Sequence, residues 1–518
     1  MRIFGLEIKR ATPKAALDTG YDASATQRRL KSWNPGEANV DFLVSQNAPL
    51  LRARSRDMVR KNPHAKKAIN TLVSNMVGKG IRPQIVTEDL AFKKELMQLW
   101  ERWCLEADSH GTCDFYGLQS LACRSMIEAG EGFGRFRSRK MSDGLVVPIQ
   151  IQLLEPDQLN TSLTLERPDG SRITDGIEYD VIGRRKAYHF YRKPPQGLFG
   201  TDDRVTVVPA SEVFHLFKPE RIGQNRGLPW LTQILVKLYE LDQYEDAELV
   251  RKKTAALFTG FITRSGDDDA GNPLPNAEDD SDEPGVADVS MEPGTMQVLA
   301  PGEDVKFSEP ADLGDNYKEF LRTQLQAIAA GAEVLYEQLT GDLRNVNYSS
   351  IRAGLVEFRR QIETYQQHLI VFQMCVPTWK QFMVTAAISG AIKLPQKYMS
   401  DPNFLKVNWI GQGFDWVDPL KDVQADKIAV RSGFKSRSRV VSEYGSDVDT
   451  IHDELASENS QADKKGLVFD TDPRYDVGGM GEVQDKEDDD NDEKPATTDQ
   501  KVTENDRSKR KKGRNNAA

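Results

Sequence analysis

Between Arg264 and Lys306 the chain has no lysine or arginine but many carboxylates, the side chains here best suited to metal chemistry. The acidic residues of this run are Asp267, Asp268, Asp269, Glu278, Asp279, Asp280, Asp282, Glu283, Asp288, Glu292, Glu303 and Asp304. Carboxylates can hold two metal ions that cleave a phosphodiester, so a metal-dependent nuclease is one interpretation. Such ligands need a rigid scaffold, whereas prolines and glycines interrupt this run in GNPLPN, EPG and PGE. We therefore favour an exposed acidic loop.

The cysteines and histidines do not form a recognisable reactive site. Cys104, His110, Cys113 and Cys123 are separated by five, two and nine residues, which differs from the CxxC spacing of structural zinc sites. The other histidines are scattered, and His189 and His215 fall in apparent strands, where a structural role is expected. The sequence contains no GxxxxGK[ST], HExxH or GxSxG motif. We therefore predict a protein that is not an enzyme and has no cofactor and no metal.

A polar loop followed by a long helix is the most informative pattern in the chain. Residues 339–350 read LTGDLRNVNYSS, with Ser349 and Ser350 as the expected N-caps of the helix. An apolar seam with alternating spacings of 4 and 3 follows, made of Ile351, Leu355, Phe358, Ile362, Tyr365, Leu369 and Phe372. Pro377 is expected to bend or end this helix. A flexible loop on a rigid helix is more typical of a mechanical part than of an active site.

Composition limits the class of protein. The 518 residues suffice for two or more cored regions, but only 38% are hydrophobic and the mean hydropathy is -0.56. A net charge of -10 argues against an ordinary protein that coats duplex DNA. No run approaches the length of a membrane span, and the first residues lack the apolar core of a secretory signal. These features predict a cytosolic protein.

The region before residue 225 is predicted to be helical first and then β-rich. Residues 43–78 show a helical pattern that Asn62-Pro63 breaks in two, and 89–128 form another helical stretch with an apolar face. That face contains Leu96, Leu99, Trp100 and Trp103. Residues 52–67 carry seven Lys or Arg and fit either a phosphate-binding or acidic-partner surface or, as we favour, a solvated helix face.

Short alternating runs then predict strands, with a hairpin around Gly183. The runs are 131–139, 147–155, 176–180, 186–192 and 205–209. A helical region followed by a mostly antiparallel β region gives the fold class α+β.

Two further helices bracket the acidic run. The first starts near Leu228 and ends in a basic cluster, with an apolar face of Leu231, Ile234, Leu235, Leu238 and Leu241. The second passes through Tyr317, Phe320, Leu321, Leu325 and Ile328. Strand-like pieces at 258–264 and 295–301 flank the acidic residues. After the long helix, 391–417 is expected to be extended, 418–467 helical, and the charge-segregated end beyond 470 disordered.

This order of parts resembles the lambda-like family of phage portal proteins, which form the ring through which double-stranded DNA enters and leaves a procapsid. The segments that carry the resemblance are 54–83, 114–137, 213–231 and, above all, 336–360 (YEQLTGDLRNVNYSSIRAGLVEFRR). Together they span roughly residues 43–425 in order.

The resemblance implies a portal fold with the following parts: an N-terminal arm (1–42), a helical and β-rich wing (43–225), paired stem helices (226–256 and 313–335), a small β-containing clip (257–312), a tunnel loop (336–350), a long spine helix (351–390), a wing return strand (391–417), a helical crown (418–467) and a disordered charged tail (468–518).

It also implies sites. The tunnel loop would present Asp342, Arg344, Asn345, Asn347 and Tyr348 to DNA, and the stem would place Lys237, Arg251, Lys252 and Lys253 along the channel. The clip would dock partners through Asp267, Asp268, Asp269, Glu278, Asp279, Asp280, Asp282 and Glu283. An acidic protomer suits a channel that must not bind phosphate tightly. Deletion of 342–348 is predicted to leave rings intact but to impair packaging or retention of DNA.

The partners implied by the resemblance are other copies of the chain in a ring of about twelve, a number that the resemblance alone supplies. The remaining partners are the terminase large subunit, the major capsid and scaffolding proteins, the head–tail connector proteins and double-stranded DNA. The location is a capsid vertex of the virion, after assembly in the cytoplasm of a bacterial host. The alternatives are a minor capsid or scaffolding protein without a channel and, less favoured, the metal-dependent nuclease.

Overall fold

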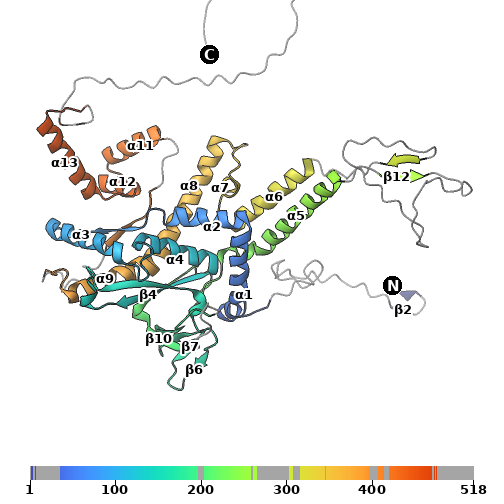
Figure 1. Ribbon diagram of the computed structural model, residues 1–518, viewed down its shortest axis with the longest axis horizontal. Coiled ribbons are helices and arrows are strands. Elements are labelled where there is room, and N and C mark those ends of the chain that lie inside the picture. The colour runs from blue at the N-terminus through green and yellow to red at the C-terminus, as the bar shows by residue number, and fades with distance from the viewer. Residues whose placement is uncertain are drawn as a thin grey trace, which may run out of the picture. The chain divides into compact units, whose positions relative to one another are not determined.

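The computed structural model describes residues 36–195, 204–257, 315–344, 346–395, 407–413, 419–469, 472 and 474, and the backbone of short strands at 2–3, 6–7, 261–264 and 303–306. The chain divides into two compact units, 1–451 and 452–518. The mixture of helices and small antiparallel sheets confirms the α+β class (Figure 1). None of the described helices is long and apolar enough to cross a membrane.

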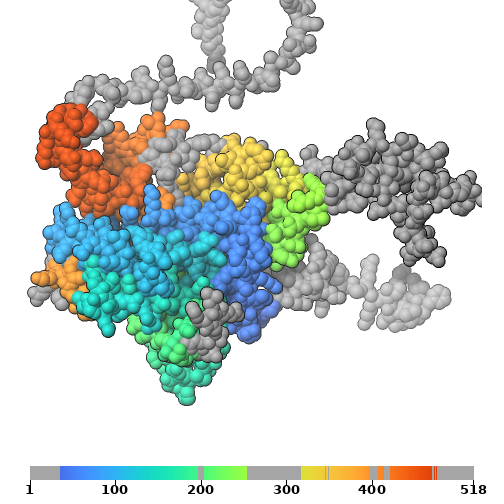
Figure 2. Space-filling view, viewed as in Figure 1, coloured from blue at the N-terminus to red at the C-terminus, as the bar shows by residue number. Residues whose placement is uncertain are grey.

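Two helices open the first unit, and Asn62 separates them as predicted. Helix α1 spans Val40–Lys61 and α2 spans Pro63–Met76. The Asn62 side chain accepts hydrogen bonds from the backbone N–H groups of His64 and Ala65, and Pro63 occupies the first turn, where its missing N–H costs nothing. Asn62 also donates to Asp242 over 3.2 Å, and α1 packs alongside α5 (Figure 2).

An aromatic cluster fixes the helical layer. Helices α3 (Leu90–Glu106) and α4 (Phe115–Ala129) are capped by the side chains of Asp89 and Asp114. Trp100 lies at the centre, with ring centroids 5.0 Å from Trp103, 5.1 Å from Trp379 and 4.9 Å from Phe382. The four predicted face residues of α3 are all buried. Because Trp379 and Phe382 come from a helix far along the chain, this cluster joins two segments of the first unit that are distant in sequence.

The β region contains two larger sheets. The strands are β3 (Arg82–Ile85), β4 (Glu131–Ser138), β5 (Ile149–Leu154), β6 (Leu165–Glu166), β7 (Arg172–Thr174), β8 (Ile177–Tyr179), β9 (Arg185–Tyr191), β10 (Val205–Pro209), β11 (Val213–Phe217) and β14 (Val407–Ile410). One sheet has the order β11-β4-β5, the other β10-β9-β8-β7-β6, and β14 pairs with β3. The five predicted strand runs are confirmed, as is the hairpin turn at Gly183, whose φ is 82°.

The two bracketing helices are α5 (Leu235–Leu257) and α6 (Asp315–Gly331). Helix α5 starts later than predicted, because a 3-10 turn, η6 (Trp230–Gln233), follows Pro229. The five predicted apolar residues of this segment are buried. The helices pack through Tyr244, whose ring lies 5.1 Å from that of Phe320.

The backbone also shows β12 (Phe261–Arg264) paired antiparallel with β13 (Glu303–Lys306) and β1 (Arg2–Ile3) paired with β2 (Leu6–Glu7). Strand β12 lies within the predicted piece at 258–264. The predicted strand at 295–301 and the acidic residues before it lie outside the described residues.

The long helix of the sequence analysis is not one regular α-helix. Helix α7 (Tyr336–Thr340) precedes it, and α8 (Tyr348–Tyr365), a π-helix η7 (Gln366–Cys375) and α9 (Val376–Ser389) follow one another directly. Pro377 was predicted to bend or end this helix, and it does not end the helical run. Pro377 lies in the first turn of α9, where a proline is tolerated, and α9 continues to Ser389.

The π-helix also changes which residues face the core. Its hydrogen bonds join residues five apart rather than four, so the apolar seam of α8 rotates out of register. Phe372, predicted in the seam, is 71% exposed, whereas Ile370, Val371 and Met374 are buried. Gln373 docks η7 onto the edge strand β11, where it accepts from Phe217 N at 2.8 Å and donates to Phe217 O at 3.0 Å.

The helices α11 (Pro419–Arg431), α12 (Arg437–Glu443) and α13 (Val448–Lys465) confirm the prediction of a helical stretch at 418–467. The 3-10 turns η3 (Met141–Asp143), η4 (Pro156–Gln158) and η5 (Ala210–Glu212) connect strands of the β region.

Candidate functional site

A short loop, 341–347, joins α7 to α8 and contains most of the predicted DNA-contact residues. Gly341 ends α7 in the left-handed conformation, with φ of 73°, and its N–H donates to Glu337 O at 2.8 Å. Asn347 begins α8, because its side chain accepts from Ser349 N at 3.0 Å. The prediction of Ser349 and Ser350 as N-caps was therefore wrong. Both lie in the first helical turn, since Asn347 is an equally good cap and comes earlier.

Asp342 and Arg344 form a two-pronged ion pair within this loop. Arg344 Nε lies 2.9 Å from Asp342 Oδ1, and Arg344 Nη2 lies 2.8 Å from Asp342 Oδ2. The Arg344 side chain is 74% exposed. Its hydrogen bonds to Asp342 hold the pKa of that carboxyl well below its usual range. The pair is charge-neutral, and its arginine faces solvent while its aspartate is half-buried, so Arg344 can exchange Asp342 for an outside group at small cost.

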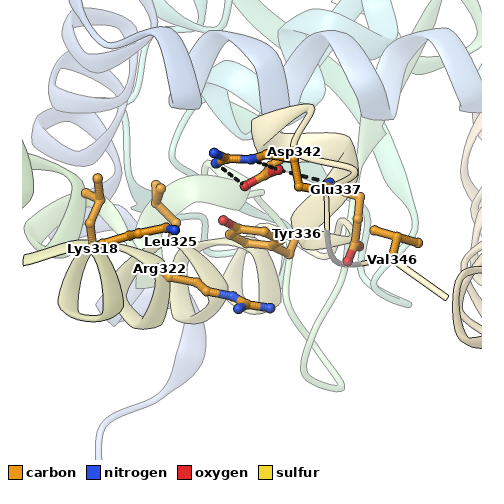
Figure 3. Close-up of a pocket in the computed structure, with 9 residues that line it drawn as sticks. Lys318, Arg322, Leu325, Tyr336, Glu337, Asp342 and Val346 are labelled. Carbon is orange, nitrogen blue, oxygen red and sulfur yellow. Dashed lines mark hydrogen bonds and ion pairs between the residues drawn. The ribbon is translucent and has the colours of Figure 1, made fainter. Parts of the chain in front are cut away.

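The loop lies against α6 across a shallow pocket of about 190 Å³ (Figure 3). Lys318 and Arg322 of α6 line it together with Tyr336, Asp342 and Arg344. The Arg322 guanidinium lies 5.9 Å from the centre of the Tyr336 ring, a cation–π contact. Basic groups of the loop and of α6 therefore gather at one place.

The structure divides the predicted loop residues into three kinds. Asp342 and Arg344 are brought together. The carboxamide of Asn347 is engaged as a helix cap, although the residue is exposed. Asn345 and the side chain of Tyr348 lie outside the described residues.

The predicted stem residues lie along α5, apart from the loop in sequence. Lys237 and Lys253 are exposed. Glu248 partly neutralises the cluster, because its Oε1 lies 2.8 Å from Arg251 Nη2 and 3.8 Å from Lys252 Nζ. Lys252 also lies 5.4 Å from the centre of the Tyr317 ring on α6. The predicted clip residues, Asp267, Asp268, Asp269, Glu278, Asp279, Asp280, Asp282 and Glu283, lie outside the described residues.

Glu333 anchors the junction between α6 and α7. Its φ is 59°, an uncommon value for a residue other than glycine. The carboxylate accepts from Lys218 Nζ at 2.7 Å and from the Tyr365 hydroxyl at 2.8 Å. The Lys218 ammonium also lies 4.5 Å from the centre of the Trp230 ring. Burial would lower the pKa of Lys218, but the bonds to Glu333 and Tyr365 outweigh it and raise that pKa. Sequence reasoning missed this anchor, since its members are far apart in the chain.

A buried ionic cluster ties α1 to the strands β4 and β11, and we call it the Glu131 cluster: Glu131, Arg52, Arg226 and His215. Glu131 is fully buried, with Arg52 Nη2 at 3.0 Å, Arg226 Nε at 2.8 Å and His215 Nε2 at 3.0 Å. Burial alone would raise the pKa of Glu131, but Arg226 and His215 hold it well below its usual range.

The Glu131 cluster corrects the interpretation of 52–67 as a solvated helix face. Arg60, Lys61, Lys66 and Lys67 are exposed as expected. Arg52, in contrast, is a core residue that also pairs with Asp157 at 2.9 Å.

His215 has the structural role that its strand position predicted. Burial lowers its pKa to about 4, so the ring is neutral at pH 7. Nε2 then carries the proton donated to Glu131, and Nδ1 faces Arg185 Nη1 at 3.3 Å. His189 likewise pairs with Glu178, at 3.3 Å.

Comparison with known proteins shows which family the chain is similar to. The family model for phage portal proteins of the lambda family matches residues 26–366. A probable portal protein of Halomonas phage phiHAP-1 is 26% identical over 499 residues, covering 92% of this chain and 93% of that protein. Portal protein B of Escherichia phage lambda is 21% identical over 486 residues, covering 85% and 89%.

Solved structures with a similar chain include the neck of a native gene transfer agent particle, with a TM-score of 0.41, 14% identity, and coverage of 76% of this chain and 93% of that one. The virion of the native gene transfer agent gives a TM-score of 0.42 at 14% identity, with 80% and 95% covered.

The match defines a structural component of a phage particle, a portal protein. Because the family model covers well over half of its residues, the chain belongs to the lambda family of phage portal proteins. Portal proteins lie in the virion capsid and provide the passage for packaged DNA, and the chain has this role.

Proposed function

We propose that copies of this chain form a ring of about twelve subunits at one capsid vertex, and that the loop 341–347 lines the DNA channel of this ring. The observation that carries the proposal is the Asp342–Arg344 pair. Its arginine is 74% exposed, it lies on a loop between two capped helices, and among the described residues the two side chains form an ion pair only with each other.

A neutral, exposed ion pair suits a channel through which DNA must move. Free arginines repeated around a ring would release counterions from the duplex and bind it tightly. Asp342 offsets the charge of Arg344, so contact with a phosphate requires exchange of one weak partner for another. The loop can then touch passing DNA without holding it.

In this proposal α5 and α6 are the stem helices that frame the channel, and α8, η7 and α9 form the spine behind the loop. The Glu333 anchor supports the loop, because it ties the end of α6 to α8 through Tyr365. The helices between Pro419 and Lys465 are the crown, and the segment 257–312 is the clip. The clip would dock the terminase large subunit during packaging and head–tail connector proteins afterwards. The major capsid and scaffolding proteins would surround the wing during assembly in the bacterial host.

The loop assignment is tested by replacement of 343–346 with Gly-Ser-Gly-Ser. This change keeps the loop length, Gly341 and Asn347, and so leaves both helix ends intact. We expect rings of normal size by negative-stain imaging, with reduced packaging or retention of DNA in procapsids. Arg360→Ser, which removes an exposed cation from α8, is the matched control and should package normally.

Normal packaging and retention by the replaced loop would contradict the loop assignment. If the unaltered chain stayed monomeric under all conditions, the account of a non-channel capsid protein would replace the ring.

The clip assignment is tested separately. Conversion of Glu278, Asp279, Asp280, Asp282 and Glu283 to their amides should weaken terminase binding, because the acidic surface would attract a basic patch on the partner. Unchanged binding at low salt would count against docking through these residues.

A further inference from the structure

The Asp342–Arg344 pair has a third charged neighbour, Arg322 of α6. Arg322 lines the same pocket of about 190 Å³ as the two loop residues (Figure 3). Hydrogen bonds from Arg344 do most to lower the pKa of Asp342, and the charge of Arg322 lowers that pKa further. Two guanidinium groups, one from the loop and one from α6, therefore act on a single carboxylate.

The contact that Arg322 makes in the structure is one that it can leave. Its guanidinium lies 5.9 Å from the centre of the Tyr336 ring, near the outer limit of a cation–π contact. Tyr336 lies between Arg322 and Asp342 in Figure 3. Because Arg322 is only half-buried, its side chain can change rotamer and pass the edge of the ring into the pocket.

A second partner for Asp342 is needed when Arg344 contacts DNA. Arg344 donates two hydrogen bonds to the half-buried Asp342 carboxylate, and both are lost when the guanidinium turns to a phosphate. Asp342 would then be an unpaired anion beside an anionic backbone. Both effects oppose the contact, because a half-buried charge without partners is costly and like charges repel each other.

We propose that Arg322 is this second partner: when Arg344 turns to a DNA phosphate, the Asp342 carboxylate pairs with Arg322 across the pocket. One ion pair breaks and two form, so every charged group keeps a counter-charge during the exchange. Arg322 is thus a positioning residue, which acts on DNA through Asp342 and Arg344. The inference rests on the proposed place of the loop in the channel and adds the step by which the loop takes up and releases a phosphate.

The test is a double-mutant cycle on rings of the full-length protein, with the affinity for a labelled short DNA duplex measured by fluorescence anisotropy at low salt. Arg322→Gln alone should weaken binding by about twofold to fivefold, the range for one exposed ion pair. In the Asp342→Asn background Arg344 has no carboxylate to leave, so Arg322→Gln should there leave the affinity unchanged.

Lys318→Gln is the matched control, because Lys318 lies one turn earlier on α6 and lines the same pocket. Its effect on affinity should be the same in both backgrounds. Arg322→Lys keeps the charge and should bind the duplex within about twofold of the unaltered rings. This second variant separates loss of the cation from loss of packing on Tyr336.

Equal weakening by Arg322→Gln in both backgrounds would overturn the proposal, because Arg322 would then act on DNA without Asp342. Coupling of Lys318→Gln to Asp342 as strong as that of Arg322→Gln would overturn it as well. The Gly-Ser-Gly-Ser replacement of 343–346 in the same assay keeps the two proposals apart. Unchanged affinity in that variant would contradict the place of the loop in the channel, whereas a loss there, without coupling between Arg322 and Asp342, would contradict the exchange alone.

Discussion

Two regions of this molecule use the same pairing of arginine with carboxylate under opposite conditions. In the Glu131 cluster the carboxylate is fully buried and contacts Arg52, Arg226 and His215. In the loop 341–347, half-buried Asp342 pairs with exposed Arg344. Because the Glu131 cluster is buried, removal of one partner leaves uncompensated charge in the core. The loop pair is weaker, because water competes for the hydrogen bonds of both partners. The comparison separates groups that stabilise the fold from a surface pair whose proposed role is contact with DNA.

The largest expected effect is that of Glu131→Gln. The change removes the buried anion of Arg226 and one of the two carboxylates that pair with Arg52, and we expect a loss of about 3–5 kcal/mol in the free energy of unfolding. Urea unfolding monitored by tryptophan fluorescence measures it. Glu357→Gln, on the exposed face of α8, is the control and should have almost no effect. Similar unfolding midpoints for both variants would show that the buried cluster contributes no more than a surface pair.

The pH dependence of stability should come from the Glu131 cluster. His215 has a folded-state pKa of about 4 against 6.5 for an unperturbed histidine, so below pH 6.5 the unfolded chain binds a proton that the folded chain rejects. Stability should therefore fall by up to about 1.4 kcal/mol per pH unit as pH drops from 6.5 to 4. The lowered pKa of Glu131 works in the same direction, because its contribution is lost as pH falls below its unfolded value of 4.5.

In His215→Gln the decline between pH 6.5 and 4 should be shallower, since one titrating group is gone. Unfolding midpoints measured across this range provide the check. An unchanged slope in the variant would mean that His215 does not titrate as its buried position requires.

A smaller effect on the free energy of unfolding is expected at the Glu333 anchor, which ties the end of α6 to α8. Lys218→Met leaves the Glu333 carboxylate with only the Tyr365 hydroxyl, at a cost of roughly 1–3 kcal/mol. Hydrogen exchange should then accelerate in α7 and in the loop while β4 stays protected. If exchange in the loop is unchanged, the anchor does not restrain it.

Asn347→Ala should have the smallest effect on stability, about 1 kcal/mol, through loss of the α8 cap. Hydrogen exchange at the first turn of α8 reports it. Ser349→Ala is the control that separates the two candidate caps: if it matches or exceeds the effect of Asn347→Ala, the cap assignment is incorrect.

Local patterns were sufficient to predict most elements. The break between α1 and α2 at Asn62-Pro63, the aromatic face of α3 and the alternating strands were all visible, because each depends on neighbours in sequence. Asp342 and Arg344 were named as loop residues, but their pairing with each other was not predicted.

Features that depend on distant partners were not visible. The Glu131 cluster unites residues from α1, β4, β11 and the segment before α5, so Arg52 looked like one more surface cation. The π-helix η7 is stabilised by docking of Gln373 on Phe217, and the apolar seam alone could not reveal the change of register at Phe372. The αL conformation of Glu333 likewise depends on Lys218 and Tyr365.

The most direct test of the central claim is photo-crosslinking in packaged particles. A benzoylphenylalanine at Leu343, which is 62% exposed on the loop, should crosslink to packaged DNA. The same group at Val181, which is 68% exposed in the turn before β9, is the control and should not. DNA linked at Leu343 and absent at Val181 is the result that the account predicts. Particles that package DNA normally but give no crosslink at Leu343 would contradict it.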